Sequence, residues 1–559
     1  MEIAPNLTPS RNLLVIPLGG LEEIGLNMTL FQYGNDLVIV DAGLMFPQED
    51  MLGVDFVIPD FTYILENREK VRGIVLTHGH EDHTGALPFL LKEIKVPVYG
   101  TALTLALVRE KLLEHEIQDV PLMVVRPRDK VTLGVFTIEF MRVTHSIVDG
   151  VGLGINTPVG PVVHTGDFKL DPTPVDGELM DFNKFTEYGE KGTVLLLSDS
   201  TNAEKGGFTF SEKEVRRAFE DIFSKTSGRI IIATFASNIH RIQQAIDVAT
   251  QFGRHVIMCG KSIVTNAQIA LDLGYLRMSE GRWVKLENLK DMPDKEVVII
   301  TTGSQGEPMS VLSRIAMDEH KDIKIKQDDT VILSAKVIPG NERSIGRIIN
   351  RLMKRGADVI YEKVSEIHVS GHASKEELKL MMNLVKPRFF MPIHGEYRHL
   401  SYHARLAEKS GIPRGNIFIM EDGEVLEIGE DGAARRDKVT AGRVFIDGKG
   451  VTGVEDIVLR DRKRLAHDGI VIIIVGLEKA TSTVVFGPEI ISRGFVFEDA
   501  SQEVLSEVRD LMNRTLSGLD MDILADASLI QAKLRTTLKK YLRNVMDRKP
   551  MIMPIIIEL

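Results

Sequence analysis

Hydrophobic residues in the first 200 positions fall into short runs that turn residues separate. LVIVDAG, GIVLTHG, GPVVHTGD and TVLLLSDST are examples, and runs of about four to eight apolar residues bounded by Gly, Pro, Asn or Asp are typical of β-strands. Residues 85–93 and 101–115 instead have the spacing of helices. This part of the chain is therefore expected to be a strand-rich α/β layered structure.

The pattern changes near residue 210. SEKEVRRAFEDIFSKT has the spacing of an amphipathic helix, for which Ser211 and Glu214 predict a capping box, and NIHRIQQAIDVATQFG predicts a helix that ends at Gly253. RIIIATFAS, HVIMCG, VVIITTGSQG and TVILSAKVIPG are continuous apolar runs. Apolar strands that alternate with helices predict βαβ units and a parallel sheet.

Later segments return to short strand-like runs that end in histidine, and then to a new α/β pattern. Residues 421–450 are charged and Gly-rich and are expected to be loose, whereas 504–516 and 527–546 predict helices before a final strand. The pattern predicts a β-rich domain at 1–208, an inserted α/β domain at 209–370, a return to the first domain at 371–448, a linker at 449–465 and a C-terminal α/β domain at 466–559.

Composition limits the kind of protein. Cys259 is the single cysteine, so an intramolecular disulfide and cysteine-rich zinc modules are excluded, and any metal must sit on His and carboxylates. The polar N-terminus lacks a signal pattern, and no apolar run reaches the length of about 18 residues that a membrane helix needs. We therefore expect a cytoplasmic protein that does not enter membranes.

Charge gives a weaker indication. The net charge of −11 argues mildly against a protein that coats nucleic acid through its global charge. The last 30 residues are basic by contrast, with Lys533, Arg535, Lys539, Lys540 and Arg543 among them. This basic stretch is either a solvated helix face or a contact for an anionic polymer.

The string LTHGHEDHTG, residues 76–85, concentrates potential metal ligands at the end of a predicted strand. Spacing of two places His78 and His80 on one side of an extended turn, while Asp82 and His83 begin the following helix. Neutral imidazole and carboxylate are ligands that zinc and manganese accept. Four such groups arranged in pairs predict two ions about 3.5–4 Å apart.

Further ligands are expected at the ends of other strands. His145 in FMRVTHS, Asp167 in VVHTGDF and His394 in FFMPIHGEY each follow an apolar run, and the Asp167 carboxylate could bridge both ions. Asp41 in LVIVDAG has the same kind of position and is expected to orient a ligand histidine.

These motifs resemble those of the metallo-β-lactamase superfamily, in which HGHEDH, His145, Asp167 and Asp41 stand in the same order. The insertion at about 210–370 resembles that of the β-CASP branch, whose members act on nucleic acids. Over nearly the whole chain, GLEEIGLNM, DAGLMFP, TFASNIHR, TGSQGEP, HVSGHAS and PIHGEYRHL are similar to the bacterial ribonuclease J family. The resemblance implies an α/β fold: an αββα sandwich, an inserted β-CASP domain and a small C-terminal α/β domain.

The resemblance also implies the roles of the site residues. It assigns one ion to His78, His80 and His145 and the other to Asp82, His83 and His394, with Asp167 between them. Asp82, Asp199 and His372 are expected to be catalytic, with Asp199 orienting His372. Whether His372 is the general acid or a phosphate contact stays open, as does the choice between zinc and manganese.

The family resemblance implies a pocket for a 5′-monophosphate one nucleotide from the ions. Two strand-to-helix turns are expected to build it, with added donors from TTGSQGEP, and backbone N–H groups at a helix start suit a phosphate. The expected pocket residues are Phe235, Ser237, Asn238, Ser304, His368, Val369, Ser370, Gly371, His372 and Ser374. Ser374 and Glu377 additionally predict a capping box.

The implied activity is a metal-dependent 5′→3′ exoribonuclease that prefers 5′-monophosphate ends and also cleaves internally, in mRNA decay and rRNA maturation. A structural calcium at Gly53, Asp55 and Asp447 is an alternative to a solvated turn. Homodimers or homotetramers are expected through the C-terminal domain, possible partners being other RNA-degradation proteins.

Two other hypotheses are a hydrolase of small esters or lactams, which would not need the insertion, and a non-catalytic RNA-binding scaffold, against which the intact ligand set argues.

Overall fold

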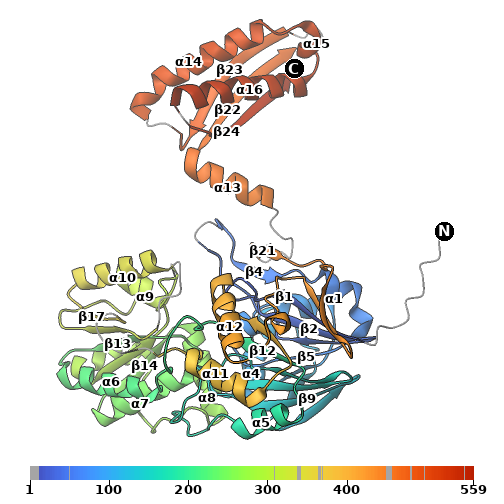
Figure 1. Cartoon of the computed structure of the whole chain (residues 1–559). Helices are drawn as coiled ribbons and strands as arrows, with labels where there is room; N and C mark the ends of the chain where they lie inside the picture. The colour runs from blue at the N-terminus through green and yellow to red at the C-terminus, as the bar shows by residue number, and fades with distance from the viewer. Residues whose placement is uncertain are drawn as a thin grey trace. The chain divides into compact units, whose positions relative to one another are not determined.

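The computed structural model describes residues 12–48, 51–307, 309–335, 341–362, 367, 369–448, 456–478, 481, 483–495, 498–546 and 548–559. The chain forms two compact units (Figure 1). The first comprises Met1–Phe46 and Phe56–Val444, and the second comprises Pro47–Asp55 and Phe445–Leu559.

Two sheets, of eight and six strands, form the centre of the first unit. In spatial order the larger sheet consists of β20 (Gly432–Arg436), β19 (Val425–Gly429), β1 (Leu13–Gly19), β2 (Met28–Tyr33), β3 (Asp36–Val40), β5 (Val71–Val75), β6 (Val98–Gly100) and β7 (Leu122–Val124). The smaller sheet consists of β18 (Phe389–Ile393), β12 (Leu195–Asp199), β11 (Gly160–His164), β10 (Val151–Thr157), β9 (Phe136–Arg142) and β8 (Lys130–Leu133). One more strand, β4 (Phe56–Pro59), also lies in this unit.

A shared apolar core joins the two sheets, and helices cover their outer faces. Phe31 and Val38 of the larger sheet pack with Phe140 and Leu197 of the smaller one. The helices of these layers are α1 (Thr62–Glu66), α2 (Glu81–Thr84), α3 (Leu87–Glu93), α4 (Ala102–Glu114), α5 (Phe182–Glu190), α11 (Lys375–Val385) and α12 (Tyr397–Lys409). The predicted αββα sandwich is confirmed, as are the helices expected near 85–93 and 101–115.

The inserted domain leaves the sandwich after β12, and the chain is back in the sandwich at α11, before β18. β12 and β18 are parallel neighbours. Its own sheet is parallel, with the spatial order β14 (His255–Cys259), β15 (Val297–Thr301), β13 (Ile230–Ala233), β16 (Thr330–Leu333) and β17 (Asp358–Ile360). Helices α6 (Lys213–Lys225), α7 (Ile239–Gln251), α8 (Lys261–Asp272), α9 (Val311–Met317) and α10 (Glu342–Lys354) flank this sheet (Figure 1). The parallel βαβ prediction is confirmed.

The two predicted capping boxes differ in outcome. Ser374 and Glu377 form the reciprocal box at the start of α11. The box at Ser211 and Glu214 is wrong, because α6 begins two residues later, with Glu212 at its N-cap. The Ser211 hydroxyl accepts from the Lys213 N–H at 3.3 Å and donates to the Thr173 carbonyl at 3.1 Å, so it serves a local and a tertiary contact without forming the reciprocal box.

The second unit contains a three-stranded sheet in the order β23 (Thr483–Arg493), β22 (Ile470–Glu478) and β24 (Met551–Glu558). Its helices are α13 (Asp456–Asp468), α14 (Glu498–Ser517), α15 (Met521–Leu524) and α16 (Ala527–Met546). Val471, Ile473 and Val475 of β22 pack against α14 and α16 on one face of the sheet. Within the described parts of the chain, no helix combines the length and apolar character needed to cross a bilayer.

Two stretches are more regular than the sequence suggests. Helix α13 occupies part of the range predicted as a linker, and β19 and β20 pair antiparallel within the range expected to be loose. A third strand, β21 (Arg443–Ile446), follows in the same range. Charge and glycine content obscured these elements, and β19 also pairs with β1, a strand distant in the sequence. The proposed domain boundaries themselves stay a prediction.

The residues named for a structural calcium contact a guanidinium in the structure. Arg462 donates to the carbonyl oxygens of Gly53 and Leu52 at 3.0 and 3.1 Å, and it pairs with the Asp447 carboxylate. The Asp55 carboxylate accepts from the Gly448 N–H at 2.8 Å. Arg462 is a distant residue that the local sequence did not indicate, and the calcium site stays a prediction.

The close packing of α5 against α11 gives a stability prediction. A Cβ added at Gly189 would lie 2.1 Å from the Leu384 carbonyl oxygen, whereas one added at Gly346 in α10 would meet nothing within 4 Å. We expect Gly189→Ala to lower the free energy of unfolding by about 1–3 kcal/mol because the helices must separate. The control Gly346→Ala should raise it by about 0.5–1 kcal/mol. Urea denaturation measures both, and a Gly189→Ala protein as stable as wild type would contradict this packing.

Candidate metal centre

Strand order brings the predicted ligands together at one edge of the sandwich. β3 and β5 are parallel neighbours, and so are β11, β12 and β18, so their carboxyl ends meet at this edge. Asp41 follows β3, the HGHEDH string follows β5, and Asp167 follows β11. Asp199 is the last residue of β12, and it stands opposite Ile393, the residue before His394.

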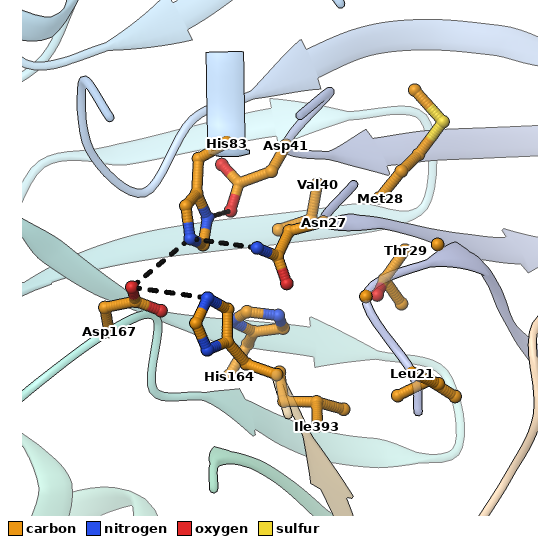
Figure 2. A pocket seen from close by; sticks show the side chains of 13 residues that line it. Leu21, Asn27, Met28, Thr29, Val40, Asp41, His83, His164, Asp167 and Ile393 are labelled. Atoms are coloured by element: carbon orange, nitrogen blue, oxygen red, sulfur yellow. Dashed lines mark hydrogen bonds and ion pairs between the residues drawn. The ribbon is translucent and has the colours of Figure 1, made fainter. Parts of the chain in front are cut away.

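One group of potential ligands consists of Asp82, His83, Asp167 and His394, of which Figure 2 shows His83 and Asp167. His83 Nε2 lies 3.3 Å from Asp167 Oδ2 and 3.8 Å from Asp82 Oδ2. His394 Nε2 lies 3.3 Å from Asp82 Oδ2 and 3.6 Å from Asp167 Oδ2. His83 and His394 therefore both direct Nε2 toward the carboxylates of Asp82 and Asp167.

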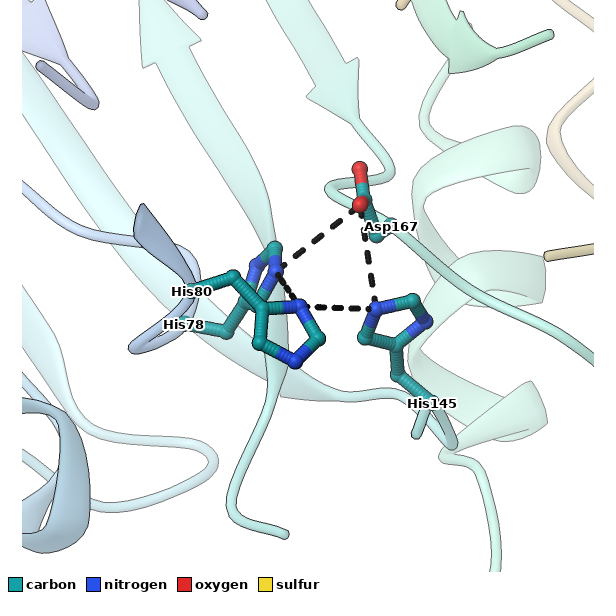
Figure 3. A group of neighbouring side chains, drawn as sticks. All are labelled: His78, His80, His145 and Asp167. Carbon is teal, nitrogen blue, oxygen red and sulfur yellow. Dashed lines mark hydrogen bonds and ion pairs between the residues drawn. The ribbon is translucent and has the colours of Figure 1, made fainter. Parts of the chain in front are cut away.

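The other group consists of His78, His80, His145 and Asp167 (Figure 3). His80 Nδ1 lies 3.0 Å from His78 Nε2 and 3.2 Å from His145 Nε2. Asp167 Oδ2 lies 3.8 Å from His78 Nε2 and 3.7 Å from His145 Nε2. A tetrahedral ion with bonds near 2.0–2.1 Å has ligand atoms about 3.3–3.4 Å apart, so both groups have the spacing of ion ligands.

Hydrogen bonds select the tautomer in which each ligating Nε2 carries a lone pair. His145 Nδ1 donates to the Gly371 carbonyl at 2.7 Å, and His83 Nδ1 donates to Asp41 Oδ2 at 2.7 Å. His394 Nδ1 lies 2.6 Å from Thr201 Oγ1, whose proton goes to Asp199. Because each Nδ1 faces an oxygen outside the group, Nε2 is the nitrogen that these rings would offer to a cation.

The Nδ1 atom of His78 is also held by a hydrogen bond, here to the neighbouring Thr77 hydroxyl. Its Nδ1 lies 3.1 Å from Thr77 Oγ1, and that hydroxyl donates to Asp41 Oδ2 at 2.7 Å. Asp41 therefore orients one imidazole of each group, His83 directly and His78 through Thr77. This contact is the one expected for Asp41, although its reach to both groups was not anticipated.

The pKa values follow from burial and from the carboxylates. Burial lowers the pKa of His80 to about 4 and that of His145 to about 3, so both are neutral and able to bind metal at pH 7. Burial also acts on His83 and His394, but carboxylates including Asp167 outweigh it and raise their pKa well above the usual value. These two imidazoles thus face a concentration of negative charge that a divalent cation would balance.

Backbone strain accompanies this arrangement. Asp41 has φ 61° and His394 has φ 56°, the left-handed region that side chains rarely adopt outside turns. Gly43 packs so closely that an added Cβ would lie 1.7 Å from the Asp82 carbonyl oxygen. Strained residues of this kind persist where surrounding contacts hold them, and they gather at functional sites.

Three residues near the ligands were missed by the sequence analysis. His164 accepts a hydrogen bond from the Gly166 N–H at 3.1 Å and lines the cavity behind His83 (Figure 2). Asn27 donates to the Asp82 carbonyl at 3.0 Å, and Thr201 contacts His394 as described above. His164 stands in the string that carries Asp167 and could have been noticed, whereas Asn27 and Thr201 carry no spacing signal.

His372 and Asp199 form a pair beside the two ligand groups. Asp199 Oδ2 accepts from His372 Nδ1 at 2.8 Å, and the ring centroids of His372 and His145 are 5.0 Å apart. His372 is the less buried partner, with 20% of its side chain exposed against 1% for Asp199. Burial disfavours the charged Asp199, but His372 outweighs it and holds the Asp199 pKa well below its usual range.

The expected phosphate segment is held from several sides. Asn202 Nδ2 donates to Ser370 Oγ at 2.7 Å and to the His372 carbonyl at 2.9 Å, and the Gly371 carbonyl accepts from His145 as above. Val369 is buried. His368 lies outside the described residues.

The N–H groups at the start of α11 already have partners in the structure, and a role for Ser374 in phosphate binding stays a prediction. Its N–H donates to Glu377 Oε2 at 2.7 Å, and its hydroxyl is used by the capping box. The next two N–H groups donate to the carbonyls of Lys205 and Gly207 at 2.9 and 3.2 Å. The segment 205–209 therefore occupies the positions that a bare helix start would leave open.

The second expected turn, residues 235–238, lies at the start of α7. Asn238 caps this helix by accepting from the Arg241 N–H at 3.0 Å. Phe235 and Ser237 are partly exposed, while Asn238 and Ser304 are buried. Asn238 therefore acts first as a cap, and Phe235 and Ser237 are the more accessible members of the predicted set.

Comparison with known proteins covers most of the chain. The metallo-beta-lactamase superfamily matches residues 23–231, and the beta-CASP domain of ribonuclease J matches 227–352. A zinc-dependent metallo-hydrolase RNA specificity domain matches 356–420, and the ribonuclease J C-terminal domain matches 457–559. Ribonuclease J of Thermus thermophilus is 44% identical over 98% of this chain and 96% of its own length. The chain belongs to the ribonuclease J family.

Other relatives extend the comparison. Ribonuclease J2 of Bacillus subtilis is 41% identical over 98% of this chain and 99% of its own, and ribonuclease J of Synechocystis is 42% identical over 98% and 87%. A crystal structure titled as a protein of unknown function from Enterococcus faecalis superposes with a TM-score of 0.54 at 15% identity, covering 74% of this chain and all of its own. That likeness concerns the fold alone.

The reach of Asp41 to both ligand groups gives a metal-binding prediction for this family member. We expect Asp41→Asn to weaken zinc or manganese binding about 10–100-fold, because the amide no longer holds the Thr77 and His83 contacts as a charged acceptor. Asp60→Asn is a matched control, since Asp60 accepts from the Thr62 N–H at 2.8 Å away from these groups. Titration of metal-free protein, followed by elemental analysis, measures the change. Unaltered affinity in Asp41→Asn would contradict this role.

Proposed function

We propose that this metal-dependent ribonuclease degrades RNA from the 5′ end, prefers 5′-monophosphate ends and can also cleave internally. The observation that supports the proposal most is that Asp167 Oδ2 belongs to both ligand groups, with the His372–Asp199 pair beside them. His78, His80 and His145 would hold one divalent ion, zinc or manganese, and Asp82, His83 and His394 the other. When bound, the ions supply Lewis acidity toward a phosphodiester group.

His372 is the residue that we assign to the substrate at this centre. Asp199 accepts from its Nδ1, so its Nε2 is the nitrogen left for a phosphate oxygen or the leaving oxygen. A protonated His372 could donate a hydrogen bond to the phosphate or a proton to the leaving group. Asp199 fixes the orientation of the His372 ring by accepting this bond, which suits both roles. Asp82 would act through the ion that it helps to hold.

The preference for a 5′-monophosphate rests on the two turns beside this centre. Ser370, Gly371 and His372 are held next to His145, and Phe235 and Ser237 are accessible at the start of α7. Because the N–H groups at the start of α11 are occupied, a phosphate would depend on side chains and on the turns rather than on that helix. A pocket closed in this way would accommodate one phosphate more readily than a triphosphate.

The cellular roles follow from the activity rather than from the geometry. We propose mRNA decay and rRNA maturation in the cytoplasm, where a chain whose single cysteine is free would stay reduced. Self-association into dimers or tetramers is proposed through the C-terminal unit. We also propose contacts with other RNA-degradation proteins.

An activity assay tests the proposal with two variants that separate metal binding from chemistry. Wild type with manganese should release mononucleotides from 5′-monophosphorylated RNA, and a chelator should abolish release. His80→Ala should lose activity together with metal. His372→Ala should keep its metal and lose about 10²–10⁴-fold in kcat, the usual contribution of a general acid. Absence of chelator-sensitive RNA cleavage in wild type, or unchanged activity in His80→Ala, would refute the proposal.

Strand β24 offers an apolar row that would suit self-association. Met553, Ile555 and Ile557 are 42%, 37% and 44% exposed on the sheet face opposite α14 and α16. We expect the double variant Ile555→Lys with Ile557→Lys to form a smaller assembly, because charges on both copies would repel and require solvation. Leu529→Lys, at a 48% exposed position of α16, is the matched control. Light scattering decides, and an unchanged mass for the double variant would exclude this face.

A further inference from the structure

Arg241 is a fully buried cation in α7 that the mechanism above does not use. Its side chain is 0% exposed, and its Nη1 donates to the Ile367 carbonyl at 2.9 Å. The same nitrogen donates to the Ser334 carbonyl at 3.0 Å and to Ser334 Oγ at 2.6 Å. Nη2 pairs with Glu212 Oε2 at 2.8 Å. A buried guanidinium with this many partners has a single available geometry.

These contacts join the two turns of the proposed 5′-phosphate pocket. The backbone N–H of Arg241 is capped by Asn238, which ends the turn that contains Phe235 and Ser237. Its side chain holds Ile367, close in sequence to Ser370 and His372. Ser334 reinforces the link, since its hydroxyl donates to the same Ile367 carbonyl at 2.6 Å. Arg241 thus contacts the end of one turn through its backbone and, through its side chain, the residue three positions before Ser370.

A buried ionic chain extends from Arg241 toward the ligand group of His145. Glu212 Oε1 lies 3.8 Å from Lys169 Nζ, which lies 3.5 Å from Asp171 Oδ2. The backbone of Lys169 exchanges two hydrogen bonds with Thr144, the residue before His145, at 2.8 and 2.6 Å. Two cations and two carboxylates balance, which is the condition under which charges are tolerated in an interior.

We propose that Arg241 is a positioning residue for the 5′-phosphate pocket. It fixes the distance between the turn at 235–238 and the segment at 369–374, and it fixes where both lie with respect to the metal centre. The inference rests on the proposed function, and it assigns the recognition of the 5′ end, rather than the cleavage step, to this buried link. Arg241 touches neither the ligand groups nor His372 in the structure. Its loss should therefore change which RNA ends are accepted more than how fast the bond breaks.

A lysine cannot replace this link. The planar guanidinium reaches Ile367, Ser334 and Glu212 from a fixed fork, whereas an ammonium is a single point charge on a flexible stem. Arg241→Lys keeps the charge balance with Glu212 and removes the fixed geometry. Ser334→Ala is a milder variant that removes one donor to Ile367 and leaves Arg241 in place.

Arg229 provides the matched control. It is also a buried arginine of the inserted domain, 3% exposed, and it pairs with Asp329 through Nε at 2.9 Å and Nη2 at 2.5 Å. It precedes β13, whereas Ser334 follows β16, so it lies at the opposite end of the parallel sheet. Arg229→Lys should weaken the domain in a comparable way without reaching the pocket.

The experiment compares the four proteins on 5′-monophosphorylated and 5′-hydroxyl oligoribonucleotides and measures amide hydrogen exchange of residues 369–373. For Arg241→Lys we expect KM for the monophosphorylated RNA to rise, and the preference for that end to fall, about tenfold, the effect of one or two displaced hydrogen bonds. kcat on the 5′-hydroxyl RNA should stay within about threefold. Exchange should be faster in Arg241→Lys and, to a smaller extent, in Ser334→Ala, but unchanged in Arg229→Lys.

The outcomes separate this inference from the proposed function. An unchanged end preference and unchanged exchange in both Arg241→Lys and Ser334→Ala would overturn it, as would an equal loss in Arg229→Lys. Wild type that cleaves RNA without distinguishing the two ends would overturn it as well. Wild type that does not cleave RNA would refute the proposed function, and hydrogen exchange would still decide whether Arg241 holds the segment.

Discussion

The structure of the centre depends on one buried carboxylate oxygen, Asp167 Oδ2. It lies 3.3 to 3.9 Å from imidazole nitrogens of five histidines: His78, His83, His145, His372 and His394. Asp167 is 3% exposed, and an ion buried without compensation costs several kcal/mol. Imidazoles and carboxylates gathered around one shared oxygen are favourable when bound cations balance the buried negative charge. The strand ends of both sheets are arranged to build that concentration.

The contacts around the centre hold the side chains that surround Asp167 in place. Asp41 and His394 keep left-handed backbone conformations, and hydrogen bonds to Nδ1 atoms direct the Nε2 lone pairs of four histidines inward. Thr201 connects Asp199 to His394, so Asp199, which orients His372, also helps to orient His394, a potential metal ligand. The chemistry and the metal sites therefore share one hydrogen-bond network, and a change in one part is expected to reach the other.

Features that depend on short stretches of neighbouring residues could be predicted from the sequence. The αββα layers, the parallel inserted sheet and all seven potential ligands follow from apolar runs that end in His or Asp, because strand ends on one edge must meet. Features made by distant partners were missed or misjudged. Ser211 and Glu214 do not form a reciprocal box, segment 205–209 occupies the start of α11, and Arg462 contacts the residues named for a structural calcium. Arg241 is the clearest case, since a lone arginine in a helix pattern gives no sign that it will be buried against Ile367.

The most direct test of the central claim is anomalous X-ray scattering from crystals of the metal-loaded protein. The account predicts two peaks, about 3.5–4 Å apart, each within bonding distance of Asp167, with His78, His80 and His145 around one and Asp82, His83 and His394 around the other. A centre that binds no ion after loading with zinc or manganese, or ions that do not share Asp167, would contradict it.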